Sequence, residues 1–152
     1  MQAQLRKTFL LYAAILAAFA GFAWARGHHA LNGTWNLVPA RSEFGGEPVI
    51  QTGTVTIYDR ERNIYVSRDF SFDSPSQSAT YRYSTDAREN QSIRKGQTFQ
   101  SKAKWEGDAL RITTTQDGVT STERYSLNPD GTLTLFVERP GQPAETLLFA
   151  RR

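Results

Sequence analysis

Short segments in which apolar and polar residues alternate are the feature that most constrains how this chain can fold. From Ile64 to Phe72, and again from Leu133 to Val137, nearly every second residue is apolar. A period of two puts alternate side chains on opposite faces of a β-strand, one face buried and one exposed. Segments of this kind, separated by turn residues at spacings of roughly 8 to 12, are typical of an all-β sandwich or barrel. No helical period competes between residues 31 and 149, so we predict an all-β domain.

The connections between these segments favour hairpins over crossovers. Gly107-Asp108 and Asp117-Gly118 are two-residue connections in which glycine and aspartate adopt positive φ at low cost. Residues 128–131 and 139–141 are longer turns that combine proline with glycine. We therefore expect an antiparallel up-and-down meander of about eight to ten strands. The expected strands lie near residues 33–38, 49–58, 64–72, 78–84, 91–95, 98–105, 109–116, 119–127, 132–138 and 144–150.

A meander of this size has two exposed edges unless its last strand pairs with its first. Closure removes the unpaired backbone groups that would otherwise recruit other chains, so we predict a closed antiparallel barrel. With about eight strands, the interior of such a barrel is either filled by side chains or wide enough for one small ligand. The sequence pattern alone leaves both arrangements open.

The N-terminal segment differs from the rest of the chain. Arg6 and Lys7 precede an uncharged, largely apolar run, and Ala23 and Ala25 supply the small residues that a signal peptidase recognises. We expect a helical signal peptide at 1–25, a flexible tail at 26–31 and the barrel domain at 32–152. The protein would then be exported, either periplasmic or secreted. The alternative is an uncleaved anchor, because the apolar run reaches the lower limit of roughly 17 residues for a bilayer-spanning helix.

Composition limits the partners of the mature chain. Removal of 25 of the 152 residues leaves 127, which suits a single domain. Loss of Arg6 and Lys7 reduces the basic residues from 18 to 16 against 15 acidic ones, a formal charge of +1. Charges of both signs are spread along the chain, so we expect no nucleic-acid partner and no membrane association after cleavage. There is no cysteine, so burial and backbone pairing must stabilise the fold.

Both ends of the predicted domain carry a family resemblance. Gly33-Thr34-Trp35 opens the first strand, and Arg151 and Arg152 follow the last one. This arrangement resembles the G-x-W element of lipocalins and related calycin barrels. The stretch from Leu31 to Gly45 is also similar to the start of bacterial exported lipocalin-like domains. The resemblance implies that Trp35 packs across one end of the barrel and that a terminal arginine lies over its ring.

Residues that commonly carry catalysis are few. The two histidines, His28 and His29, precede the first strand, which gives a nucleophile-histidine arrangement no rigid frame. If cleavage leaves Arg26 as the N-terminus, Arg26-Gly27-His28 presents four nitrogens that suit Cu(II) or Ni(II), although a polar tail explains the same residues. We therefore expect no cofactor and no metal site in the barrel. A carboxylate pair brought together by folding stays open.

Arg68 and Glu123 fall on strand faces whose other residues are expected to be buried. A buried charge needs a partner there. One hypothesis is that Arg68, helped by tyrosines, binds the anionic head of an apolar ligand. Alternatively, Arg68 and Glu123 pair with each other, or a bulge turns either side chain to solvent. The candidate ligand-binding residues are Arg68, Phe70, Tyr81, Tyr83, Trp105, Glu123 and Tyr125. The aromatic members could equally belong to the core.

These patterns predict an exported, non-catalytic, lipocalin-like protein that binds a small amphiphilic or mostly apolar ligand. One alternative is an interaction or inhibitor module of the cell envelope with a filled barrel. Another is a barrel enzyme with an internal carboxylate acid/base pair. A binding protein should contain an apolar cavity, an interaction module should lack one, and an enzyme should combine a cavity with perturbed carboxylates. The sequence carries no indication of oligomeric state.

Overall fold

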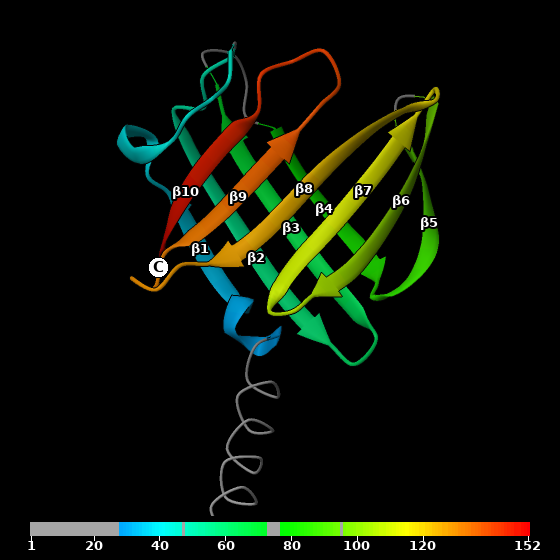
Figure 1. The fold of residues 1–152 in the computed structure, drawn as a ribbon, viewed down its shortest axis with the longest axis horizontal. Coiled ribbons are helices and arrows are strands. Elements are labelled where there is room, and N and C mark those ends of the chain that lie inside the picture. Colours follow the sequence, from blue (N-terminus) through cyan, green and yellow to red (C-terminus); the bar gives the residue numbers. More distant parts are fainter. Residues whose placement is uncertain (1–27, 47, 73–76, 95) are drawn as a thin grey trace, which may run out of the picture.

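The computed structural model describes residues 28–46, 48–72, 77–94 and 96–152, so the expected signal peptide lies outside the described residues. The described chain forms one ten-stranded antiparallel sheet that curls into a barrel (Figure 1). Its elements are η1 (His28–Leu31), β1 (Gly33–Leu37), η2 (Pro39–Arg41), β2 (Thr52–Arg60), β3 (Asn63–Ser71), β4 (Gln77–Ser84), β5 (Asp86–Arg94), β6 (Gln97–Glu106), β7 (Ala109–Gln116), β8 (Val119–Leu127), β9 (Leu133–Glu138) and β10 (Glu145–Arg151). Among these residues, no helix has the length and apolar character needed to cross a bilayer.

The last strand pairs with the first, as the edge argument predicted. β1 and β10 run antiparallel, with Trp35 opposite Arg151 and Leu37 opposite Phe149. The predicted meander is therefore confirmed, and the barrel that was predicted to be closed is nearly closed. The remaining break lies between β4 and β5, which are the two edge strands of the sheet. The Ser84 backbone N–H donates a hydrogen bond to Asn90 Oδ1 at 3.3 Å across this break.

β5 differs from the predicted strand at 91–95. It begins at Asp86 and includes a register shift between Asp86 and Glu89. Its first five residues are almost entirely polar, which hides the strand from a search for alternation. The predicted hairpin turns are present: Asp117 and Gly118 have φ values of 50° and 78°, and Gly107 has 64°. Those positive angles match the glycine and aspartate chosen there.

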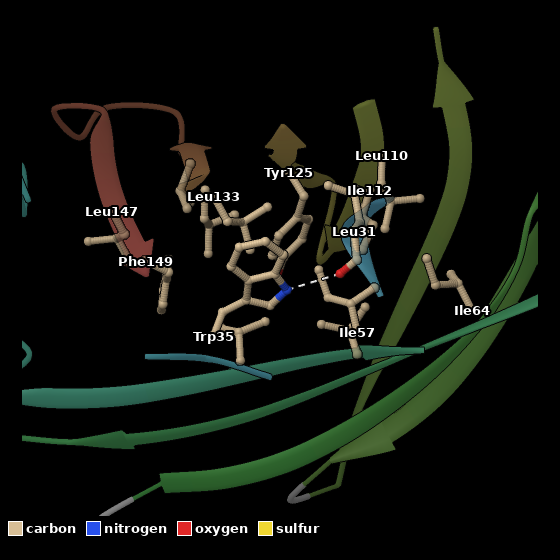
Figure 2. Packing of buried hydrophobic residues seen from close by; sticks show 14 of the residues in the cluster. Leu31, Trp35, Ile57, Ile64, Leu110, Ile112, Tyr125, Leu133, Leu147 and Phe149 are labelled. Carbon is tan, nitrogen blue, oxygen red and sulfur yellow. Dashed lines mark hydrogen bonds between the residues drawn. The ribbon is translucent and has the colours of Figure 1, made fainter. Parts of the chain in front are cut away.

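Apolar side chains fill one end of the barrel, which we call the closed end. Trp35 lies at the centre of this core, and its indole Nε1–H donates a 2.9 Å hydrogen bond to the Leu31 carbonyl oxygen (Figure 2). The largest fully buried side chains of the core include Leu31, Trp35, Ile57, Leu110, Tyr125 and Phe149. Leu31 brings η1 across the closed end, at the bottom of Figure 1. Full burial of one such leucine contributes about 1.5–3 kcal/mol.

Residues 28–31, the described part of the tail expected at 26–31, form η1 and contact the barrel. Leu31 is fully buried, and the His28 ring stacks on Trp105 with centroids 4.1 Å apart. Arg151 Nη1 and Nη2 donate hydrogen bonds to the carbonyl oxygens of Asn32 and Ala30, respectively. Sequence reasoning treated this segment as polar, whereas its contacts with the barrel give residues 28–31 a defined place.

Candidate functional site

The end of the barrel opposite η1 contains two adjoining pockets, and we call this end the mouth. Their volumes are about 390 and 530 Å³. Both pockets are lined by Arg68, Tyr81, Glu123, Arg139 and Gln142. The smaller, which we call the polar pocket, adds Tyr83, Phe99, Thr114, Gln116, Val119 and Ser121. The larger is called the apolar pocket here only after the apolar residues that distinguish it from the smaller one, because its lining also includes polar and charged side chains such as Gln77 and Glu145; those apolar residues are Ile50, Phe70, Phe72, Leu135, Val137 and Leu147.

A bidentate ion pair lies between these pockets. Arg68 Nη1 donates to Glu123 Oε1 at 2.7 Å, and Arg68 Nη2 donates to Glu123 Oε2. Only 16% and 17% of the two side chains are exposed. Arg68 comes from β3 and Glu123 from β8, and alternation turns both inward. Of the arrangements that the sequence left open, the structure has the two charges paired with each other in the planar fork that arginine forms with carboxylates.

Two tyrosine rings flank the Arg68 guanidinium, whose Cζ is 5.3 Å from the Tyr81 centroid and 5.8 Å from that of Tyr125. Burial is the largest single influence on the pKa of Arg68 and lowers it, but the charge and hydrogen bond of Glu123 together with the charges of Tyr125 and Tyr83 outweigh burial, and the pKa lies above its ordinary value. Burial also raises the pKa of Tyr125, against the opposing charge of Arg68. At neutral pH the site therefore holds a guanidinium cation beside a neutral phenol.

A second ion pair lies at the rim of the mouth. Arg139 Nη1 donates to Glu145 Oε1 and thereby links the strands β9 and β10 on either side of their turn. Arg68, Glu123, Arg139 and Glu145 are the charged residues among the described lining of the two pockets. Each cation faces a carboxylate, so these four residues contribute no net charge.

The same pairing limits the chemistry of the site. Glu123 and Glu145 are each hydrogen-bonded to a guanidinium rather than to one another. Within the described parts of the chain, no group of three or more histidine, cysteine or acidic residues has a geometry that could hold a metal ion. Hydrogen-bonding groups beside an apolar surface are typical of a binding site, in which a few polar groups orient a mostly apolar ligand.

The structure brings together most of the candidate residues, but not all of them. Phe70 and Tyr81 line the apolar pocket, and Tyr83 lines the polar one. Tyr125 lies below the ion pair as part of the core, fully buried.

Trp105 lies away from the pockets and stacks on His28 at the closed end. Phe99 and Trp105 share the inward face of β6, but they are six positions apart along the strand, a distance of about 20 Å. Trp105 therefore does not line the pocket that Phe99 lines, although both side chains face the inside of the barrel. His28 Nε2 lies 3.2 Å from the Gly107 carbonyl oxygen, whereas Arg26 and Gly27 of the suggested copper or nickel chelate are outside the described residues.

Sequence reasoning missed several residues of the mouth. Ile50, Gln142 and the Arg139–Glu145 pair come from connecting segments or strand ends. Glu145 carried a usable signal, because it alternates with Leu147 and Phe149 and so had to face inward. No comparable signal marked Gln142, since a turn residue has no fixed face.

A third hollow, of about 360 Å³, lies at the break between the edge strands β4 and β5. Tyr81 and Tyr83 line both this groove and the polar pocket. Their rings are stacked, with centroids 6.1 Å apart. These two tyrosines therefore form the wall between the mouth and the side of the barrel.

Comparisons with known proteins establish the fold. No protein-family model and no curated protein matches the sequence. Among solved structures, the fluorescent protein UnaG is 19% identical with a TM-score of 0.63, covering 80% of this chain and 96% of its own. Secretory abundant heat soluble protein 4 from Ramazzottius varieornatus is 12% identical with a TM-score of 0.64, covering 81% and 95%. Fatty-acid-binding protein 1 from Echinococcus granulosus is 9% identical with a TM-score of 0.62, covering 81% and 98%. These likenesses show that the chain shares the antiparallel β-barrel fold of the three proteins.

Proposed function

We propose that this chain is an exported, non-catalytic binding protein for a small, mostly apolar ligand that enters at the mouth of the barrel. The observation that carries the proposal is the pair of adjoining pockets on either side of Arg68 and Glu123. Their volumes of about 390 and 530 Å³ fall in the size range of sites for small ligands. A barrel that served only as an outer surface for protein partners would not need this space.

The lining suggests how a ligand lies. An apolar tail fits against Ile50, Phe70 and Leu147, where it would displace water from apolar surface. The polar end then lies near the ion pair, within reach of the hydroxyl and amide groups of the polar pocket. Phe70, Tyr81, Tyr83, Arg68 and Glu123 are the ligand-binding residues of this proposal. The likeness to a protein named for fatty-acid binding supports a ligand with an apolar tail.

Export is the second part of the proposal and rests on the sequence of residues 1–25. A basic start, an apolar run and small residues at Ala23 and Ala25 support cleavage after Ala25. The intact mass of protein recovered from its own compartment tests this directly. A mass that retains the first 25 residues would overturn it.

Native mass spectrometry tests the binding function. Protein purified without denaturation should retain a small molecule, or should take one up from a mixture of medium-chain lipids. Ala79 faces the apolar pocket, so Ala79→Trp should fill it and abolish binding. Thr80 is the next residue of β4 and is exposed, so Thr80→Trp is the matched control and should bind as the wild type does. Equal binding by both variants would place the ligand elsewhere, and no binding by the wild type would overturn the proposal.

A further inference from the structure

We infer that the polar end of the ligand is uncharged: the site takes a neutral, hydrogen-bonding head on an apolar tail, such as a long-chain alcohol or primary amide, and discriminates against the corresponding carboxylate. The inference rests on the binding function proposed above and names its ligand class.

The first step concerns the cation that an anionic head would need. Both Nη groups of Arg68 are already bound to the two oxygens of Glu123. This is the bidentate geometry that a carboxylate ligand would itself adopt. A carboxylate ligand therefore meets a guanidinium whose Nη1–Nη2 edge is occupied by a second carboxylate and whose remaining Nε–H is buried.

The second step concerns the consequence of displacing Glu123. Its side chain is only 17% exposed, and Arg68 is its hydrogen-bonding partner in the structure. An anionic ligand that bound Arg68 in place of Glu123 would leave the Glu123 carboxylate without its partner in a largely dehydrated position. Removing one member of a buried pair is strongly unfavourable, because the other charge stays buried without compensation.

The third step concerns the rest of the mouth. Arg139 is the other cation of the described lining, and it is bound to Glu145. The charges around the pockets therefore cancel at short range, and they provide no positive field to offset the dehydration of an anion. A neutral head enters without that cost.

The fourth step concerns what the lining does offer. Gln116 and Gln142 carry carboxamides that can both donate and accept, and Ser121 carries a hydroxyl that can do the same. Such groups match an alcohol or an amide, which also donates and accepts. They match an acceptor-only carboxylate less well.

Two probes with the same tail test the inference. Dodecanoate and dodecanamide are titrated into the purified protein by calorimetry at pH about 8, where the carboxylate is ionised. We expect dodecanamide to bind at least tenfold more tightly. Dodecanoate binding equally well or better would overturn the inference and leave the binding function standing, whereas failure of both probes would overturn both. This comparison needs no variant.

A variant without the Glu123 carboxylate tests whether this residue sets the preference for an uncharged head. Glu123→Gln keeps the shape of the side chain and frees the charge of Arg68, so the affinity for dodecanoate relative to that for dodecanamide should rise at least tenfold. Glu145→Gln at the more exposed rim pair is the matched control and should change dodecanoate affinity far less. If Glu123→Gln leaves the preference between the two probes unchanged, Glu123 does not set the charge selectivity and the inference is wrong.

Discussion

Arg151 lies over the indole ring of Trp35, with its Cζ 4.2 Å from the ring centroid. The same guanidinium donates hydrogen bonds of 2.9 and 2.8 Å to the carbonyl oxygens of Asn32 and Ala30. One cation from β10 thus holds both the tryptophan of β1 and the turn that covers the closed end. Gly33 makes room for it: φ is 135°, and a Cβ there would lie 2.8 Å from Arg151 Nη1.

Replacement of this arginine should weaken the closed end. We expect Arg151→Met to lower the free energy of unfolding by about 1 kcal/mol, because it removes a cation–π contact and two charge-assisted hydrogen bonds at an exposed site. Arg151→Lys should restore less than half of the loss, since an ammonium lacks the planar fork. Urea unfolding measures both effects. Arg152→Met is the control, and an equal loss in that variant would show that the interaction with Trp35 is not the cause.

Replacing one member of the Arg68–Glu123 pair should destabilise the fold strongly, whereas replacing both members by apolar residues should destabilise it much less. Arg68→Met alone should lower the free energy of unfolding by about 3–5 kcal/mol, because it leaves a mostly buried carboxylate without its partner. The double variant Arg68→Met/Glu123→Leu should be much closer to the wild type. A double-mutant cycle of urea unfolding midpoints measures the coupling. Losses that simply add would contradict the pairing.

How far the sequence could predict this pair has a clear physical limit. Alternation along β3 and β8 correctly turned Arg68 and Glu123 inward, because the side-chain period of a strand is two. Their meeting could not be predicted, since they are 55 residues apart and come from non-adjacent strands. Local pattern fixes which face a residue takes, whereas the curvature of the whole sheet fixes which residue lies opposite.

The same reasoning explains why the sequence pattern placed the start of β5 too late in the chain. A period-two pattern arises only where one face of a strand is buried and the other is wet. β5 borders the break in the sheet, and its exposed Arg88, Glu89 and Gln91 leave little apolar signal. Trp105 and Phe99 show a second limit of sequence prediction. Alternation along a strand predicts which face a residue takes, but not whether it lies near the mouth or near the closed end of the barrel. The pairing of the last strand with the first was predictable from the cost of unpaired edges, whereas the remaining break between β4 and β5 was not.

Gly53 should control the size of the apolar pocket. A Cβ at this position would lie 2.8 Å from Phe70 Cδ1 and 3.3 Å from Leu37 Cβ. We expect Gly53→Ala to push the Phe70 ring toward the pocket and to cost about 1–3 kcal/mol in the free energy of unfolding. Dodecanamide affinity, measured by calorimetry, should fall as the pocket narrows. Gly46→Ala is the control, because a Cβ there meets nothing within 4 Å. Unchanged affinity in Gly53→Ala would mean that the ligand does not reach Phe70.

Tyr125 should make the protein lose stability in alkaline solution. Burial raises the pKa of its phenol in the folded state, whereas an unfolded tyrosine ionises near pH 10. A raised folded pKa means that the stabilising effect of the neutral phenol is fully present below about pH 10 and is lost as the pH rises further, by roughly 1.4 kcal/mol per pH unit. Tyr125→Phe has no proton to lose, so it should show a shallower decline in urea midpoints between about pH 9 and 11.

The phenylalanine variant should also fold as well as the wild type at neutral pH. The Tyr125 hydroxyl is buried, and no hydrogen bond of normal geometry reaches it from the described residues, while the neighbouring Arg68 is bound to Glu123, so removal of the hydroxyl leaves Arg68 with that partner. Tyr58→Phe, on the exposed outer face of β2, is the matched control for the loss of one phenol. If Tyr125→Phe and Tyr58→Phe decline in parallel with the wild type, Tyr125 ionises as readily in the folded chain as in the unfolded one. In that case the closed core would admit water to the level of the ion pair, and the boundary between the core and the mouth would have to be placed lower in the barrel.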